Sequence, residues 1–360
     1  MNIYITGLSS GYEVEHLVRL FYPMAPLTLT PPEEGTDCVW AETRPDSLWA
    51  MVRQGGKSQT AEAPLPAPAE EGGETPEFAL ASLTYDLLRR WTGIRPPWGK
   101  MTGVRPVRLV HDKRAAGWTE EQIDDFFLGR FDCSPEKYRM AKAIADLQEP
   151  ILKAGSAPKT YSLYIGIPFC PSRCSYCSFV SCNLDRDRKL VQPYVDCLCR
   201  EVEAIREEAD KAGLKLCSIY IGGGTPTSLS AAQLRQLMGT VRDCFDLSAL
   251  VEYTVEAGRP DCTDAEKLAV IKEYGATRIS INPQTFSDEV LANIGRKHAA
   301  QHILDCCAES RAAGHDAINM DLIAGLPGDT VEGFEKSLRQ AIALDPENIT
   351  AHTLPLTRAS

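Results

Sequence analysis

Three cysteines within eight residues are the strongest chemical signal in the sequence. They follow a predicted strand as Cys170-Pro-Ser-Arg-Cys174-Ser-Tyr-Cys177, a C-x3-C-x2-C spacing. Three thiolates on one short loop can bind three irons of a four-iron, four-sulfur cluster and leave the fourth iron open to another ligand. A structural zinc ion normally has four protein ligands, and Cys182 could supply the fourth. The spacing therefore predicts a metal centre, with the iron–sulfur cluster favoured over zinc.

A glycine run after the next predicted strand could bring backbone close to a ligand of that centre. In Gly222-Gly223-Gly224-Thr225 the glycines permit a close approach and offer backbone groups for hydrogen bonding. A phosphate cradle is the competing interpretation, but no Lys-Ser or Lys-Thr follows these glycines. The short Gly56-Lys57-Ser58 sequence has Met51 where a phosphate loop needs its first glycine. We therefore expect no nucleotide phosphate site at either place.

The strands and helices that must position these residues are predicted by a regular sequence pattern that begins at Tyr161. Short β-rich runs alternate with longer helical patterns, and six strand signals are expected at residues 162–167, 217–223, 251–257, 278–282, 318–325 and 348–354. The helical patterns between them cover 193–213, 231–245, 265–275, parts of 288–314, and 331–344. Strands separated by helices predict a parallel α/β sheet, either doubly wound or a partial barrel, with the active site at the carboxyl ends of the strands. Because the last strand signal ends almost at Ser360, we expect the chain to be truncated there.

The first part of the chain is less regular. We expect an α+β segment over residues 1–54, followed by a flexible linker or loop rich in Pro, Ala and Glu over 55–77. A mainly helical continuation should cover 78–158, with helices near 78–90, 120–130 and 135–152. The core domain is expected to cover 159–360.

Composition excludes several classes of protein. The chain has 44% hydrophobic and 24% charged residues, which is typical of globular proteins, and no apolar run approaches the roughly 18 residues of a membrane span. Its 38 basic and 49 acidic residues give a net charge of −11, which argues against a protein that binds nucleic acid mainly by electrostatics. Thirteen cysteines without a signal segment predict free thiols and metal ligands in a reducing cytoplasm. We expect Cys197, Cys199, Cys217, Cys306 and Cys307 to be buried as small hydrophobic residues.

One local stretch departs from the acidic average. Between Arg89 and Arg114 there are eight basic residues and one acidic residue, and two tryptophans lie among them. The stretch could be a solvated basic face or an interdomain contact, or it could bind a polyanionic ligand or partner. Both interpretations remain open at this point.

The combined motifs resemble a known enzyme family. The run Tyr164-Ile-Gly-Ile-Pro-Phe-Cys170, the cysteine spacing, and Gly222-Gly-Gly-Thr-Pro-Thr227 are similar to radical S-adenosylmethionine (SAM) enzymes of the oxygen-independent coproporphyrinogen III oxidase-like family. The resemblance covers about residues 163–360 and implies a partial (β/α)6 barrel preceded by a smaller α+β domain. The segments TVEAGRPD, RISINPQTF and WGKMTGVRP resemble the corresponding sequences of the HemZ subgroup.

The resemblance also implies cofactors and site residues. Cys170, Cys174 and Cys177 would hold one [4Fe–4S] cluster, whose open iron takes an exchangeable SAM; a second SAM is also compatible with the family. The residues implied to bind cofactor are Tyr164, Gly223, Gly224, Thr225, Glu256, Gln284, Arg296 and Asp321. Tyr164 would lie beside the cluster, Arg296 fits a bidentate carboxylate clamp, and a carboxylate such as Glu256 suits ribose hydroxyls. A low-potential donor such as flavodoxin or ferredoxin would supply electrons.

The implied activity is oxidative decarboxylation of coproporphyrinogen III propionates to vinyl groups, which gives protoporphyrinogen IX. Two departures from the decarboxylating pattern favour an alternative: Gly166 replaces a histidine, and Ser178-Phe179 follows Cys177 where a further cysteine is expected. The Cys-x-Phe ending resembles the haem-chaperone branch, in which His298, His302 or His352 could ligate haem. A third hypothesis, a radical enzyme acting on RNA, rests on the basic stretch and conflicts with the net charge of −11.

Overall fold

The computed structural model describes residues 1–66 and 75–354, and its contacts divide the chain into two compact units, Met1–Pro150 and Ile151–Ser360. The division falls inside helix α5 (Pro135–Gly155). Sequence reasoning places the boundary at 158/159 instead, where the helical pattern has ended. The first half of α5 belongs to the first unit because its buried side chains Tyr138, Ala141 and Ala145 pack into the core of that unit.

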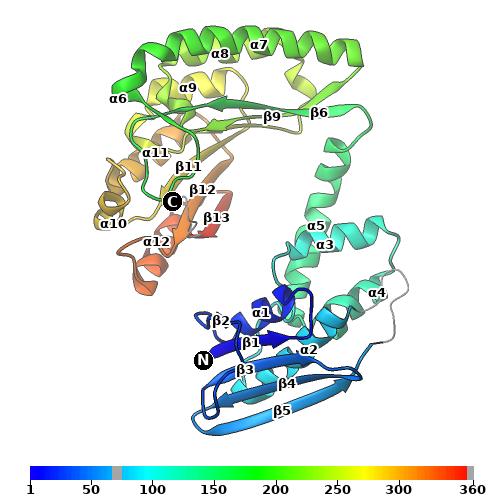
Figure 1. The fold of residues 1–360 in the computed structure, drawn as a ribbon. Coiled ribbons are helices and arrows are strands. Elements are labelled where there is room, and N and C mark those ends of the chain that lie inside the picture. The colour runs from blue at the N-terminus through cyan, green and yellow to red at the C-terminus, as the bar shows by residue number, and fades with distance from the viewer. Residues whose placement is uncertain (67–74, 355–360) are drawn as a thin grey trace. The chain divides into compact units, whose positions relative to one another are not determined.

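A five-stranded sheet with two helices forms the first part of the N-terminal unit. The order is β2-β1-β3-β4-β5; β1 is parallel to β2 and β3, whereas β3, β4 and β5 are antiparallel neighbours. The elements are β1 (Asn2–Thr6), α1 (Tyr12–Arg19), β2 (Leu27–Thr28), β3 (Cys38–Thr43), β4 (Ser47–Gln54), β5 (Lys57–Pro64) and α2 (Pro76–Thr92) (Figure 1). Apolar side chains of α1 and α2 pack with those of the strands in one core.

The predicted linker over 55–77 is wrong for residues 57–64, which form β5 and pair with β4 along its whole length. Gly55 and Gly56, both with positive φ, make the two-residue turn of this hairpin. Because β5 is an edge strand, most of its side chains are exposed and need not be apolar. The composition of an edge strand thus resembled that of a linker. Residues 67–74 of the same prediction lie outside the described residues.

The rest of the N-terminal unit is helical, as predicted. It contains α3 (Pro106–Ala115), α4 (Glu120–Asp124), a π-helix (Asp125–Arg130) and the first part of α5. Their core is built around Val110, Ile123, Phe127 and Tyr138.

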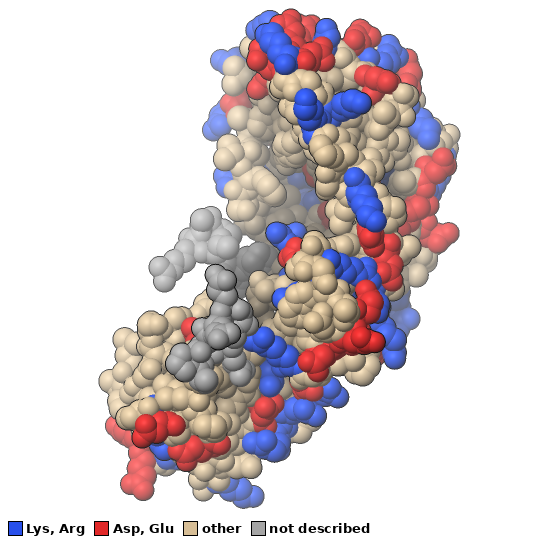
Figure 2. Space-filling view, turned by 90° about the vertical axis from the view of Figure 1, so that its right-hand side faces the viewer, with Lys and Arg blue, Asp and Glu red and all other residues tan. Residues whose placement is uncertain are grey.

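Four of the eight basic residues in the stretch 89–114 pair with acidic residues outside it. Arg89 and Arg95 both bind Asp132, at 2.9 and 2.7 Å, and Lys100 lies 3.4 Å from Asp86. Arg114 pairs with Glu120, Asp146 and Glu149. On the visible surface, Lys and Arg are interspersed with Asp and Glu (Figure 2). This pairing supports the solvated-face interpretation over a polyanion site.

The second unit is a partial (β/α)6 barrel, as predicted. Its sheet has the order β13-β12-β11-β10-β9-β6, and every neighbouring pair is parallel. The strands are β6 (Thr160–Ile167), β9 (Lys215–Gly223), β10 (Glu252–Glu256), β11 (Arg278–Gln284), β12 (Ile318–Ala324) and β13 (Asn348–Thr353). The main helices are α7 (Val191–Ala212), α8 (Ala231–Cys244), α9 (Ala265–Glu273), α10 (Asp288–Asn293), α11 (Ala300–Ala312) and α12 (Val331–Ala343) (Figure 1).

The alternation of side chains along each strand separates an apolar face from a polar one. In β9, Ile219 and Ile221 are buried in the core shared with the helices, whereas Tyr220 points to the opposite face. Polar side chains bond to one another on that inner face: Asn319 donates to Ser280 at 2.8 Å, and its carbonyl oxygen accepts from Asn348 at 2.6 Å. The partial barrel therefore presents a hydrogen-bonded polar lining beneath the carboxyl ends of its strands.

Two further findings concern the whole described chain. All thirteen cysteines are free thiols. None of the helices in residues 1–66 and 75–354 combines the length and the apolar character needed to cross a membrane.

The core of the barrel should dominate the stability of this unit. Ile281 in β11 is fully buried, so Ile281→Ala should lower the free energy of unfolding by about 2–5 kcal/mol. The matched substitution Ile342→Ala, at a side chain that is 58% exposed on α12, should change it by less than about 0.5 kcal/mol. Urea unfolding followed by circular dichroism measures both, and equal losses would contradict the assigned core.

Candidate active site

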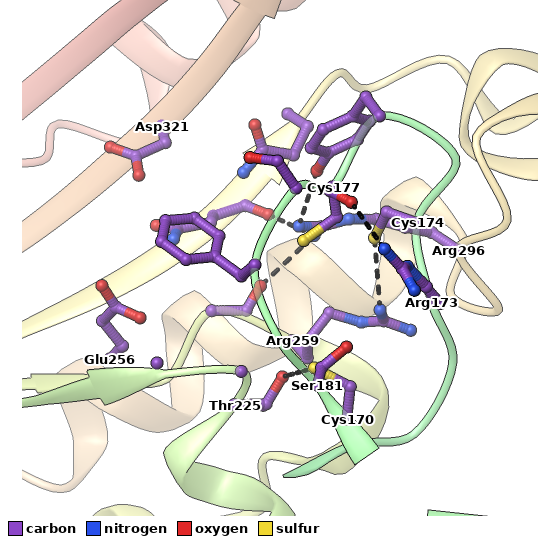
Figure 3. Close-up of a pocket in the computed structure, with 18 of the residues that line it drawn as sticks. Cys170, Arg173, Cys174, Cys177, Ser181, Thr225, Glu256, Arg259, Arg296 and Asp321 are labelled. Carbon is purple, nitrogen blue, oxygen red and sulfur yellow. Dashed lines mark hydrogen bonds between the residues drawn. The ribbon is translucent and has the colours of Figure 1, made fainter. Parts of the chain in front are cut away.

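A cavity of about 520 Å3 lies at the carboxyl ends of the barrel strands. This volume is typical of a small-molecule site. All eleven residues singled out in the sequence line it: Cys170, Cys174, Cys177, Tyr164, Gly223, Gly224, Thr225, Glu256, Gln284, Arg296 and Asp321. Figure 3 shows the three cysteines on one side of the pocket and Glu256 and Asp321 on the other. The fold thus brings together residues that are up to 157 positions apart, from Tyr164 to Asp321.

The cysteine loop is held by bonds to its own ends and to a distant turn. Two-residue strands β7 (Phe169–Cys170) and β8 (Cys182–Asn183) pair across its base. Farther along the loop, the Ser175 N–H donates to Ile294 O at 3.0 Å, and Ser172 Oγ donates to Gly295 O at 2.9 Å. The loop itself contains almost no regular structure, so these contacts fix where the thiols lie.

The alternative zinc site finds no support. Cys182, its predicted fourth ligand, lies in β8 and does not line the cavity. Within the described residues, no three His, Cys, Asp or Glu side chains are grouped so that they could hold a single metal ion. A four-iron cluster places its three cysteine ligands on three different irons, so the sulfurs need not converge on one point. The donor set therefore fits the cluster better than a zinc ion.

Two glycines are required where the second strand meets the cysteine loop. Gly223 has a φ of 108°, a conformation that side chains disfavour. A Cβ on Gly224 would lie 2.9 Å from Cys170 Sγ and 2.8 Å from Phe169 O, so this position has no room for a side chain. Beside them, the buried Thr225 hydroxyl donates to Cys170 Sγ at 3.5 Å. The glycine run thus forms the cavity wall next to the first cysteine.

An aromatic and acidic wall faces the cysteines. Tyr164 of β6 stacks on Tyr220 of β9, with ring centroids 5.8 Å apart, and Tyr220 Oη donates to Glu256 Oε1 at 2.5 Å. Burial raises the pKa of Glu256, and the nearby Asp321 charge raises it further, against the hydrogen bond from Tyr220, which lowers it. Tyr220 therefore both orients this carboxylate and favours its ionised form, an acceptor suited to hydroxyl groups of a ligand.

Two buried polar side chains in the cavity wall have atoms without partners among the described residues. Gln284 is 6% exposed, has a φ of 68°, and leaves Oε1 unpaired. Arg296 is 9% exposed; its Nη1 donates to Asn282 O at 2.6 Å and Gly258 O at 3.2 Å, and its Nε is unpaired. A buried unpaired donor and acceptor are costly, so both fit a site that binds a polar ligand. Carbonyl groups occupy Nη1, and Nη2 donates one N–H to Tyr176 Oη at 3.4 Å, so the Nε edge is the side of the guanidinium left for the predicted carboxylate clamp.

The sequence analysis missed Arg259 and Tyr176, which line the cavity, and Tyr220, which contacts the lining residues Tyr164 and Glu256. Tyr220 could have been found because it stands two positions before Gly222 and so shares its face of the strand. Tyr176 lies between two of the cysteines, and burial raises its pKa to about 12. Arg259 follows β10 in a Gly-Arg-Pro turn; an arginine at a strand end is the only signal it gives.

Predictions for the other cysteines had mixed outcomes. Cys199, Cys217, Cys306 and Cys307 are buried as expected, but Cys197 is exposed because it lies on the outer side of α7. Of the two phenylalanines that flank the cysteines, Phe169 is buried in the core, whereas Phe179 lines the cavity and is 66% exposed.

The cysteine assignment makes a sharp prediction. Changing Cys170, Cys174 or Cys177 singly to Ser should remove most of the iron and sulfide bound after anaerobic reconstitution, because in the predicted cluster each thiolate would hold a different iron. Cys182→Ser is the matched control in the same segment and should keep both. Iron and sulfide analysis with absorption spectra measures the outcome; loss of the cluster from Cys182→Ser to the same degree would restore the four-cysteine alternative.

Comparison with known proteins agrees with this site. Residues 164–341 match the radical SAM superfamily. The oxygen-independent coproporphyrinogen-III oxidase-like protein HemZ of Bacillus subtilis is 40% identical over 288 residues, which cover 78% of this chain and 56% of that protein. The heme chaperone HemW of the same organism is 40% identical over 194 residues, covering 54% of this chain and 50% of its own.

Comparison with a solved structure indicates the same group of proteins. Coproporphyrinogen III oxidase (HemN) from Escherichia coli, a radical SAM enzyme, superposes with a TM-score of 0.50 and 29% identity over 57% of this chain and 47% of that one. The chain spans about half the length of these relatives. Its cysteine loop and polar strand ends lie within the matched region. The chain belongs to the radical SAM superfamily, in the group that contains the oxygen-independent coproporphyrinogen III oxidases and the proteins similar to them.

Proposed function

We propose that this protein is a radical SAM oxidoreductase of tetrapyrrole biosynthesis that decarboxylates the propionates of coproporphyrinogen III to vinyl groups and so forms protoporphyrinogen IX. The observation that carries the proposal is the single cavity lined by the three cysteines and all eight predicted cofactor residues. The similarity to a coproporphyrinogen-III oxidase-like protein and to a coproporphyrinogen III oxidase supports the choice of substrate.

The cavity residues divide into those that hold the cluster and those that hold SAM. Cys170, Cys174 and Cys177 would bind three irons, and SAM would occupy the fourth. The cluster and SAM, when bound there, would supply a 5′-deoxyadenosyl radical by one-electron cleavage of the sulfonium. A second SAM remains part of the proposal, and the same cavity would have to admit it beside the substrate.

The polar groups of the wall suit the two ends of SAM. The unpaired Arg296 Nε can donate to its carboxylate, and the unpaired Gln284 Oε1 can accept from an N–H group. Glu256, held by Tyr220, can accept from the ribose hydroxyls. Because Gln284 and Arg296 are almost fully buried, the ligand that pairs with them would also be shielded from water.

The substrate would enter from the exposed side, where Arg173, Phe179 and His352 line the cavity. Arg173 carries a charge that can attract an anionic propionate. In the proposed reaction each propionate would give one hydrogen atom to the 5′-deoxyadenosyl radical, which becomes 5′-deoxyadenosine. It would then release one carbon dioxide and pass one electron to an acceptor, which leaves a vinyl group. A flavodoxin or ferredoxin in a reducing cytoplasm is the proposed source of the electron that starts each turnover.

A haem chaperone is the second candidate, and two observations favour it. The chain is similar to heme chaperone HemW over 194 residues, and Gly166 and Phe179 depart from the decarboxylase pattern. Of the three histidines considered as haem ligands, His352 lines the cavity. His298 is buried against Asp261, and the His302 ring bonds the Ala299 N–H at the start of α11. His352 is therefore the proposed axial ligand in this alternative.

The ion pairs in the basic stretch argue against the RNA hypothesis. Arg89, Arg95, Lys100 and Arg114, four of its eight basic residues, are paired with acidic side chains. The charge available to a polyanion is accordingly smaller than the sequence indicates.

The assignment of Glu256 to SAM binding can be tested directly. Glu256→Gln replaces a charged acceptor by an amide of the same size, so SAM should bind about 10–100-fold more weakly while the cluster still assembles. Glu252→Gln is the matched control on the same strand; Glu252 does not line the cavity, and SAM affinity should be unchanged. Equilibrium binding to anaerobically reconstituted protein measures both, and unchanged affinity in Glu256→Gln removes Glu256 from the site.

The proposed activity is tested with the complete gene product, reconstituted with iron and sulfide and supplied with SAM, a low-potential reductant and coproporphyrinogen III. Mass spectrometry should detect 5′-deoxyadenosine together with tetrapyrrole that has lost one or two carboxyl groups. Stoichiometric haem binding and transfer without decarboxylation would instead establish the chaperone. His352→Ala should then abolish haem binding and leave the cluster intact.

A further inference from the structure

We propose that Arg259 is a positioning residue for the cysteine loop. Its fixed positive charge beside the Cys174 sulfur would also raise the reduction potential of the cluster held there. This inference rests on the cluster assignment in the proposed function. It does not depend on which tetrapyrrole reaction the protein performs.

Arg259 lies directly behind the cysteine loop. It stands in the turn after β10, is 4% exposed, and donates from Nη1 to Cys174 Sγ at 3.5 Å (Figure 3). The same guanidinium binds Ser172 twice, from Nη1 to the backbone oxygen at 3.3 Å and from Nη2 to Oγ at 2.8 Å. One side chain from a different strand end thus contacts two positions of the loop.

A buried acidic group fixes the other edge of the guanidinium. Nε and Nη2 donate to the two carboxylate oxygens of Asp261, at 3.0 and 3.1 Å. Asp261 Oδ1 in turn lies 3.4 Å from Nδ1 of His298, whose side chain is fully buried. This bidentate ion pair determines the direction in which the Arg259 side chain reaches the loop, because a guanidinium group bound along one edge has little rotational freedom.

The charge of Arg259 distinguishes Cys174 from Cys170. Cys170 accepts from Thr225, a neutral hydroxyl, whereas Cys174 accepts from a group that stays protonated at any physiological pH. Reduction adds one electron, hence one negative charge, to the cluster. A buried cation bonded to a ligand sulfur stabilises that added charge, and hydrogen bonds to sulfur and net charge are among the terms that set cluster potentials.

A lysine could not replace all of these contacts. Arg259 uses both edges of its fork at once, one for Asp261 and one for Ser172 and Cys174. A lysine has one ammonium group, which could keep the charge near the sulfur but not span both partners. Arg259→Lys therefore separates the effect of charge from the effect of position.

The test uses the reconstituted holoprotein with Arg259→Gln, Arg259→Lys and, as a control, Arg235→Gln. Arg235 is an arginine of α8 that pairs with Glu273 at 2.7 Å on the surface and does not line the cavity. Two quantities are measured: the midpoint potential, by titration followed with electron paramagnetic resonance, and the rate at which a chelator removes iron.

We expect Arg259→Gln to shift the potential to more negative values and to lose iron to the chelator about 10-fold faster. Arg259→Lys should recover much of the potential but not the iron retention, and Arg235→Gln should match the unchanged protein in both. Unchanged potential and iron retention in Arg259→Gln would overturn the proposal.

A second variant keeps the proposal testable if Arg259→Gln does not fold. Asp261→Asn keeps the arginine and removes only the carboxylate charge that orients its guanidinium, so faster iron loss is still expected. Iron retention equal to that of the unchanged protein would overturn the positioning role. If the unchanged protein assembles no cluster, the proposed function fails. If it assembles one that is indifferent to Arg259, only this inference fails.

Discussion

The site depends on one constraint: three thiols must be held at fixed positions by a loop that has almost no regular structure of its own. The loop between Cys170 and Cys182 is closed at its base by a two-residue strand pair. Further support comes from distant parts of the sequence, including the Ile294–Gly295 turn through backbone oxygens and Arg259 through its guanidinium. The parallel sheet supplies this support because the carboxyl ends of its strands meet at one edge.

The same sheet provides two environments from one alternating pattern. Side chains such as Ile219 and Ile281 pack under the helices and supply the apolar burial that stabilises the unit. Their neighbours along the strand form the polar lining, where Asn319 joins β11, β12 and β13 through its amide. The strand ends above that lining then carry Glu256, Gln284 and Asp321 into the cavity. A cofactor with charged and polar ends can bind there without disturbing the apolar core.

The sequence predicted the six strands of the second unit, most of its helices and eleven residues that line the cavity, since period-two alternation and short-range spacing are local properties. It was less informative where the outcome depends on distant partners. The basic stretch stayed open between a solvated face and a polyanion site because its partners Asp132 and Asp146 lie outside it in sequence. β5 looked like a linker because an edge strand needs few apolar residues. Arg259 gave almost no signal, because its importance comes from a sulfur 85 positions earlier in the chain.

The packing of the cavity wall around the proposed cofactor site does not decide between a decarboxylase and a chaperone. A Cβ at Gly166 would meet its nearest neighbour, Tyr164 Cε1, at an ordinary contact distance of 3.5 Å, and the backbone there is regular strand. The backbone position of Gly166 therefore leaves room for a Cβ, so close packing around that atom does not require the glycine. The proposed SAM cradle of Glu256, Gln284 and Arg296 suits either activity. The proposed choice between them then falls to the groups that would meet the tetrapyrrole, and Arg173, Phe179 and His352 are exposed residues of the cavity that could do so.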